Sequence, residues 1–348
     1  MTGILDPVTV ATFPSPLLAL PGAVAAEGRD AGIAQHYGDP HGEQRRLADA
    51  VGWIDRSNRD VLIVPGTDRL SWLHSLTSQH LAELADGRGT EALVLSPHGH
   101  VEHHLLVAET GGVTWLDVEP GTGPDLLTFL DSMRFLLRVD PSDVSEHWAV
   151  LSLVGPDTPD VLTALGVRAP AAYDVAPLAG GWVRRMPWPG AAAADVLVPR
   201  SELAEFAERL ARAGATPAGI WAFEALRVEA RRPRLRNESD HRTIPHEVGW
   251  LESAVHLNKG CYRGQETVAR VHNLGRPPRR LVLLHLDGSL ESLPATGAAV
   301  TLDGRQVGFV TTAVRHYELG PVALALVKRN TADDAVLHVG DVAAAIDA

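Results

Sequence analysis

The chain has 348 residues, enough for two or three compact units, because a single hydrophobic core rarely serves more than about 250–300 residues. Apolar residues make up 45% of it and charged residues 21%, which excludes long disordered regions. The formal net charge of -12 excludes a surface built mainly to bind nucleic acid. The single cysteine, Cys261, excludes an intramolecular disulfide and any cluster held by this chain's thiolates alone.

The first predicted elements are a helix, a strand and a second helix between residues 44 and 81. The strand is the run 60–64, and a Pro65-Gly66 turn separates it from the helix that follows. Next, Ala92–Ser96 and Val101–Ala108 predict two strands, and the Pro97-His98-Gly99 turn between them predicts a hairpin.

Further along, helices and strands mix without strict alternation. Helices are predicted at 125–137 and 202–213, and strands at 149–154 and 195–199. This pattern favours an α+β fold over a doubly wound sheet. After Pro277 and Pro278 the chain changes to short strands rich in valine and leucine, with a hairpin at Asp303-Gly304. We therefore predict two domains, 1–278 and an all-β domain at 279–348.

The densest motif is Lys259-Gly260-Cys261-Tyr262-Arg263-Gly264-Gln265-Glu266. Its glycines allow sharp bends, and Lys259 and Arg263, each two residues from the thiol, would favour the thiolate of Cys261. The alternative is a buried, inert cysteine that packs as a small hydrophobe.

A histidine cluster follows the first hairpin turn. His98, His100, Glu102 and His104 alternate, so on an extended strand they would share one face and could bind zinc. No third converging ligand, HExxH motif or cysteine pair accompanies them, and a polar strand facing solvent explains the pattern equally well. We expect no metal site.

The motif KGCYRGQE closely resembles the signature of YgfZ-type proteins, bacterial relatives of a mitochondrial iron–sulfur assembly factor. Residues 52–79, 219–234 and 304–327 resemble, in order, three regions of the glycine-cleavage T-protein superfamily. These are its early region, the helix before its folate cleft and its C-terminal barrel.

The resemblance implies a T-protein-like three-part arrangement around a central cleft. Two interleaved α/β subdomains with antiparallel sheets form residues 1–278, and a β-barrel forms 279–348. In that family the glutamate of an Arg-x-Glu-Ala motif contacts the pterin ring of tetrahydrofolate, and Glu229 matches it, although Arg231 replaces the family's next glycine. The other expected folate-binding residues are Arg227, Trp221, Trp250, Lys259, Tyr262, Gln265 and Arg270.

One departure decides the expected function. Aminomethyltransferases carry paired aspartates after the glycine-rich turn, whereas this chain has His103 and His104 there. Without that acid group, aminomethyl transfer is not expected. We therefore expect a cytoplasmic, monomeric tetrahydrofolate-binding protein that supports assembly or repair of iron–sulfur proteins, with a redox or ligand role for Cys261. A folate-dependent one-carbon transferase and a noncatalytic interaction module without folate remain alternatives.

Overall fold

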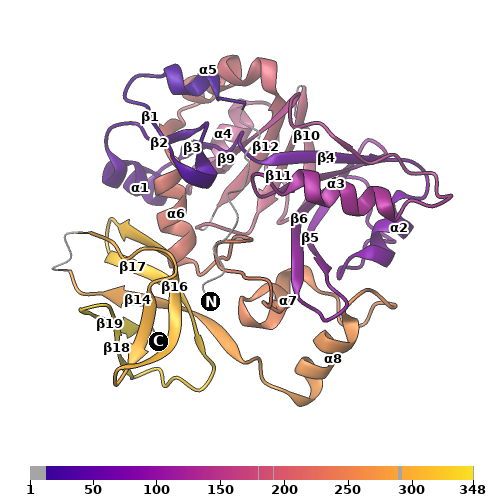
Figure 1. The fold of residues 1–348 in the computed structure, drawn as a ribbon. Coiled ribbons are helices and arrows are strands. Elements are labelled where there is room, and N and C mark those ends of the chain that lie inside the picture. Colours follow the sequence, from indigo (N-terminus) through magenta and orange to yellow (C-terminus); the bar gives the residue numbers. More distant parts are fainter. Residues whose placement is uncertain (1–12, 179, 191, 289–291, 348) are drawn as a thin grey trace.

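The computed structural model describes residues 13–178, 180–190, 192–288 and 292–347, so the first twelve residues of the predicted 1–278 domain lie outside it. Two units with sheets lie beside each other, and a barrel packs below the first of them (Figure 1). The barrel carries the C-terminal end of the described chain.

The first unit contains a six-stranded sheet in the order β10-β11-β12-β9-β3-β13, antiparallel except for the β13–β3 pair. Its strands are β3 (Gly52–Asp55), β9 (Trp148–Val154), β10 (Val175–Leu178), β11 (Gly181–Met186), β12 (Ala193–Pro199) and β13 (Thr216–Ala218). Helix α5 (Leu203–Arg212) covers it with an amphipathic face that buries Leu203, Phe206, Ala207 and Leu210. This unit also contains α1 (Pro40–Asp49), α4 (Thr158–Ala164), the 3-10 helices η1 (Pro16–Ala19), η2 (Gly28–Asp30) and η3 (Arg200–Glu202), and the short pair β1 (Val24–Ala25) and β2 (Ala34–His36).

The second unit contains an antiparallel five-stranded sheet in the order β5-β6-β7-β4-β8. Its elements are β4 (Asp60–Pro65), α2 (Arg69–Leu76), β5 (Arg88–Leu95), β6 (Val101–Thr110), β7 (Val113–Val118), α3 (Gly123–Ser132) and β8 (Ser142–Asp143). The predicted β5–β6 hairpin is confirmed. The helix predicted at 125–137 ends earlier, at Ser132, because the chain turns through Phe135 with φ of +46° and leaves Phe135 and Leu136 exposed.

The two sheets are interleaved along the chain. Strand β3 belongs to the first sheet, β4 to β8 to the second, and β9 returns to the first, where it pairs with β3. The expected α+β arrangement of two interleaved units and a barrel is therefore confirmed. From the first sheet the chain continues through α6 (Ile220–Glu229), η4 (Pro245–Glu247), α7 (Trp250–Ala254) and α8 (Gln265–Leu274).

The closed barrel has the strand order β14-β17-β16-β15-β18-β19. Its strands are β14 (Arg279–Leu286), β15 (Ala299–Leu302), β16 (Arg305–His316), β17 (Gly320–Lys328), β18 (Val336–Val339) and β19 (Val342–Ile346). Asp303 and Gly304 both have positive φ, as a two-residue hairpin turn requires, so this predicted hairpin is confirmed. No helix among the described residues is long and apolar enough to cross a membrane.

Candidate functional site

Glu91, a carboxylate inside strand β5, is the centre of a polar cluster where the two units meet. Its side chain is fully buried. It lies 2.9 Å from His104 Nε2 on β6 and 2.7 Å from Arg232 Nη2, just after α6. Three more donors complete its shell: the hydroxyl of Tyr173 at 2.5 Å, Ser253 Oγ at 3.2 Å and Trp188 Nε1 at 3.4 Å. One buried carboxylate thus joins five segments of the chain.

The electrostatics of this cluster keep Glu91 ionised. Burial alone would raise its pKa, but the hydrogen bond from His104 and the charges of His104 and Arg232 outweigh burial and hold the pKa well below its usual range. Two oxygens that face five donors also have no acceptor capacity left. Glu91 can therefore organise a site, but it is a poor proton donor near neutral pH.

Aromatic rings surround this carboxylate. Trp250, fully buried, stacks on His104 with ring centroids 4.8 Å apart, and the Arg232 guanidinium lies 4.9 Å from the centroid of Trp188. Trp188, Tyr173 and Arg232 are only half-buried, so they form the accessible edge of the cluster. That edge offers a flat apolar surface beside a cation, a combination suited to a ring system with a polar rim.

Next to the Glu91 cluster lies a buried network of alternating charges. Arg227 uses all three side-chain nitrogens within it, since Nε and Nη2 donate to Glu224, and Nη1 donates to Glu238 at 3.0 Å. Arg234 bonds both Glu224 and Glu119. The network continues through Arg59, Asp117, Arg184 and Asp195. Arg227, predicted to contact folate, is therefore committed to the fold and has no nitrogen free for a ligand.

Glu229, the predicted pterin contact, is the last residue of α6 and lies outside this network. Its side chain is 47% exposed, and its ion-pair partner is His316 of β16, with Nε2 3.3 Å from Oε2. Unlike Glu91, it therefore has oxygens accessible to a ligand. Trp221, at the start of the same helix, is 49% exposed and lies 5.6 Å from the ring of His36.

The structure places the side chain of Lys259 at the end of α2. Lys259 is buried and its Nζ donates to the backbone carbonyls of His74, Thr77 at 2.5 Å and Gln79 at 3.1 Å, so it caps the C-terminal end of α2. Burial lowers the pKa of this lysine to about 8. Its three ammonium hydrogens are therefore directed to carbonyls at the helix end.

The rest of the motif is anchored on the first hairpin. Arg263 pairs with Glu102 of β6 at 2.8 Å, and Tyr262 is buried. Gly264 has φ of +82°, and a Cβ there would lie only 2.5 Å from the carbonyl oxygen of Ser96. The glycine is thus required for the close approach of the motif to the β5–β6 turn.

Cys261 itself is exposed and free, so the alternative that it is buried as a small hydrophobe is wrong. Gln265 begins α8, and Arg270 is exposed on that helix. The Cys261 segment contacts α2 and the β5–β6 turn, and through Tyr262 it shares an apolar cluster with Leu326 of the barrel, where Glu229 pairs with His316. Among the described residues, no hydrogen bond or ion pair joins this segment to Glu229.

The histidine cluster does not form the expected common face. His98 lies in the turn, and a bulge between Val94 and Leu95 shifts the register, so that Val94 pairs with His103 whereas Leu95 pairs with Val101. Glu102 points to Arg263, while His104 points to Glu91. Within the described ranges, no group of three or more His, Cys, Asp or Glu side chains is arranged to hold a metal ion.

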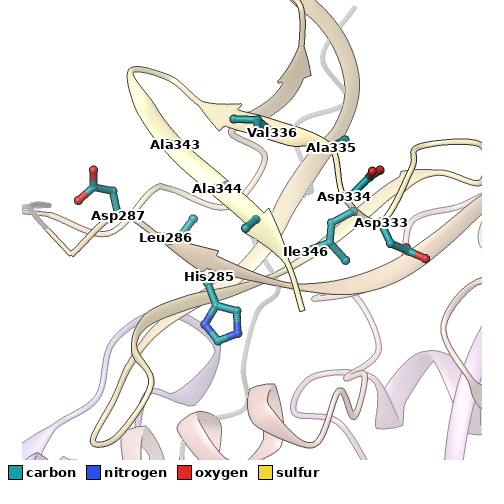
Figure 2. A pocket seen from close by; sticks show the side chains of 11 residues that line it. His285, Leu286, Asp287, Asp333, Asp334, Ala335, Val336, Ala343, Ala344 and Ile346 are labelled. Carbon is teal, nitrogen blue, oxygen red and sulfur yellow. The ribbon is translucent and has the colours of Figure 1, made fainter. Parts of the chain in front are cut away.

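Neither Glu229 nor Cys261 is among the residues that line two cavities in the described part of the chain. One, of about 380 Å³, is lined by Ser96, His100, Val101, Glu102, His103, Asp125, Arg236 and His241. Burial lowers the pKa of His103 to about 4, so this ring is neutral near pH 7. The charged linings are already paired, Arg236 with Asp125 and Glu102 with Arg263. The other, of about 550 Å³, lies beside β14, β18 and β19 in the barrel (Figure 2).

Comparison with known proteins decides the family. The profile described as GCVT N-terminal domain matches residues 22–259, and the profile described as Glycine cleavage T-protein C-terminal barrel domain matches residues 279–345. The chain belongs to the glycine cleavage T-protein family. This T-protein relative is 27% identical to an aminomethyltransferase of Rubrobacter xylanophilus, over 85% of this chain and 81% of that enzyme. It is 26% identical to the chloroplastic protein At1g60990 of Arabidopsis thaliana, over 74% of this chain but only 61% of that protein.

A solved structure shows the same fold. The glycine cleavage system aminomethyltransferase T of Bartonella henselae superposes with a TM-score of 0.84, covering 94% of this chain and 93% of that one. Sequence identity is 18%, so this likeness concerns the fold alone.

Sequence reasoning missed Glu91, Tyr173 and Trp188. A signal for Glu91 was present, because it shares a strand face with Leu93 and Leu95 in an otherwise apolar run, and a carboxylate there must be paired. Tyr173 and Trp188 carried no comparable signal, since they lie in loops 82 and 97 residues away from Glu91.

Proposed function

We propose that this T-protein relative binds a reduced folate and serves iron–sulfur proteins, as a member of the YgfZ-type branch, without transferring an aminomethyl group. Membership of the family supports the folate part, because relatives named aminomethyltransferase match more than four fifths of the chain. The KGCYRGQE motif with its exposed thiol supports the iron–sulfur part.

The proposal rests on the residue that occupies the position where the family's aspartates are expected. His104 stands there, buried and bonded to an ionised Glu91 whose oxygens are saturated with donors. Neither residue of this pair offers a free carboxyl to a reacting folate nitrogen. The geometry therefore favours binding over group transfer.

The residues fit a pterin. A pterin needs a carboxylate that accepts parallel bonds from its amino group and ring N–H, and a flat surface for its ring. Glu229 offers accessible oxygens. Arg232, three residues later in the chain, lies over the ring of Trp188 at the accessible edge of the Glu91 cluster. We propose that Glu229 holds the pterin, that this edge lines the site, and that Trp221, Trp250, Tyr262, Gln265 and Arg270 supply further contacts.

Titration of tryptophan fluorescence with tetrahydrofolate and 5-formyltetrahydrofolate tests folate binding. Quenching with a micromolar Kd is expected, and Glu229→Gln should weaken it at least tenfold, because bonds to a charged acceptor are lost. Glu208→Gln, an exposed carboxylate change on α5, is the matched control. Absence of quenching in the wild type would instead support an interaction module without folate.

The iron–sulfur part needs a separate measurement. One thiolate cannot hold a cluster alone, so Cys261 would share a ligand or redox role with a partner. We expect Cys261→Ala to lower the activity of a [4Fe–4S] enzyme in cells that depend on this chain. Unchanged activity would remove Cys261 from the function.

A one-carbon transferase remains the second candidate, because the curated relatives with the widest coverage are named aminomethyltransferase. It requires an acid other than Glu91. Turnover of an aminomethyl or methylamine donor with tetrahydrofolate by the purified protein would establish it, and would refute the binding-only proposal.

A further inference from the structure

The segment from residue 256 to residue 276, which carries Cys261 and α8, differs in charge from the rest of the chain. It has a formal charge of +3, from Lys259, Arg263, Arg270 and Arg276 against Glu266, within a chain of net charge -12. Lys259 and Arg263 are engaged by carbonyls and by Glu102. Arg270 and Arg276 are exposed and, across the described ranges, form no hydrogen bond or ion pair, so their charge faces solvent.

Helix α8 is also poorly packed. Of its ten residues only Val268 is buried, although a helix this short is stable in water mainly through packing. Leu274, at its last position, is 87% exposed, and Leu257, four residues before the thiol, is 39% exposed. Apolar side chains beside free arginines are typical of protein interfaces.

The surface is nevertheless held in place. The three carbonyl bonds of Lys259, the buried ring of Tyr262 and the close approach of Gly264 to Ser96 fix the segment on both sides of Cys261. A partner would therefore meet a preformed surface and lose little affinity to ordering it.

We infer that the basic segment 256–276, through its exposed Arg270, Arg276, Leu257 and Leu274, docks an acidic, partly apolar segment of a partner protein. Charge complementarity selects an acidic segment. The strong negative charge of the remaining chain selects against a long polyanion such as a nucleic acid, which would extend into a repulsive field. The inference builds on the proposed function by describing its partner, but it can be tested without folate and without a cluster.

The single cysteine makes the surface measurable. In thiol–disulfide exchange the Cys261 thiolate attacks the disulfide of a reagent, forms a mixed disulfide and releases one thiolate of that reagent. Arg270 lies roughly 8 Å along the helix axis from Gln265, within a Debye length of the start of α8 at 0.1 M salt. The free arginines should thus raise the rate at which Cys261 reacts with the dianion 5,5′-dithiobis(2-nitrobenzoate). They should lower the rate of its reaction with the dication cystamine.

We expect Arg270→Glu/Arg276→Glu to slow the dianionic reagent about tenfold at low ionic strength and to accelerate cystamine, with both effects diminishing as salt is added. The matched control is Arg45→Glu/Arg212→Glu, the same charge change at exposed, unpaired positions on α1 and α5. It should change either rate less than twofold. Equal effects in the two double variants, or parallel changes with both reagents, would overturn the inference.

Docking itself is measured by fluorescence anisotropy with a labelled decapeptide of alternating glutamate and leucine pairs. We expect saturable binding that Arg270→Glu/Arg276→Glu abolishes, that Leu274→Ser weakens and that the Arg45→Glu/Arg212→Glu control retains. Tighter binding of a single-stranded oligonucleotide of equal charge would refute the assignment to a protein partner. Folate titration of Leu274→Ser, which changes none of the predicted folate contacts, separates this result from the proposed function: weaker peptide binding with unchanged folate binding is expected.

Discussion

Charged side chains are paired in the interior of this molecule but partly unpaired on the segment 256–276, which we call the Cys261 face. In the interior, Arg227, Arg234 and their carboxylate partners are buried and paired with one another. Around Cys261, Arg270 and Arg276 are exposed and unpaired within the described part of the chain. Paired interior charges determine how segments fit together, and only the free outer ones are available to another molecule. Charged motifs in this family therefore need their partners identified before a binding role is assigned.

The largest effect on stability is expected when one buried arginine is removed from the interior network. Arg234→Met would leave Glu119 and Glu224 short of a buried counter-charge and should lower the free energy of unfolding by about 3–5 kcal/mol. Urea denaturation measures it. Arg236→Met, two residues away in a solvent-exposed pair with Asp125, should cost less than about 1 kcal/mol. Equal losses would mean that the network is not a structural core.

Glu91 offers a pH-dependent version of the same test. Glu91→Gln should cost about 2–4 kcal/mol at pH 7, because Arg232 loses a buried counter-charge. Since the folded pKa of Glu91 is lowered, its stabilisation is fully present above its ordinary pKa of about 4.3 and is lost as the pH falls toward the folded value. The gap between wild type and variant should therefore narrow from pH 5 to pH 3. A gap that widens on acidification would contradict an ionised Glu91.

Substitution of one glycine tests how the Cys261 face is anchored on the β5–β6 turn. Gly264→Ala forces a side chain into a left-handed conformation and against Ser96, and should cost about 1–3 kcal/mol. Hydrogen exchange should report the loss mainly at the β5–β6 turn and α8. Gly340→Ala, with positive φ but open space around it, is the control for the conformational part.

The smallest effect is expected on the outer face itself. Arg263→Ala removes a half-exposed pair with Glu102 and should change the free energy of unfolding by less than about 1 kcal/mol. Thermal unfolding measures it against Arg234→Met. A loss as large as that of Arg234→Met would assign the motif to the fold and not to a partner surface.

Much of the fold could be predicted from local signals. The Pro97-His98-Gly99 turn and the Asp303-Gly304 pair fix their hairpins within a few residues, so both were found. The end of α3 was missed because Phe135, Leu136 and Leu137 continue an apolar pattern that the chain leaves in solvent.

The site was harder to predict, because its geometry depends on contacts distant in sequence. The motif around Cys261 was recognisable, but whether Lys259 serves the thiol or the end of α2 depends on contacts about 180 residues apart. The Glu91 cluster likewise unites β5 with Arg232, 141 residues later. Sequence identified residue types, and only the tertiary fold reveals which charge is already neutralised.

The return of the chain to its first sheet has a consequence for synthesis. Strand β3 ends at Asp55, and its antiparallel neighbour β9 begins at Trp148, so the first sheet must wait for more than ninety further residues to be made. At ribosomal speeds this delay is roughly 5–20 s, and the whole five-stranded sheet, from β4 to β8, is synthesised within it. In the nascent chain, β3 therefore remains unpaired with β9 while the second sheet is made. Fragments cut between the two sheets should regain the native fold only when both are supplied together.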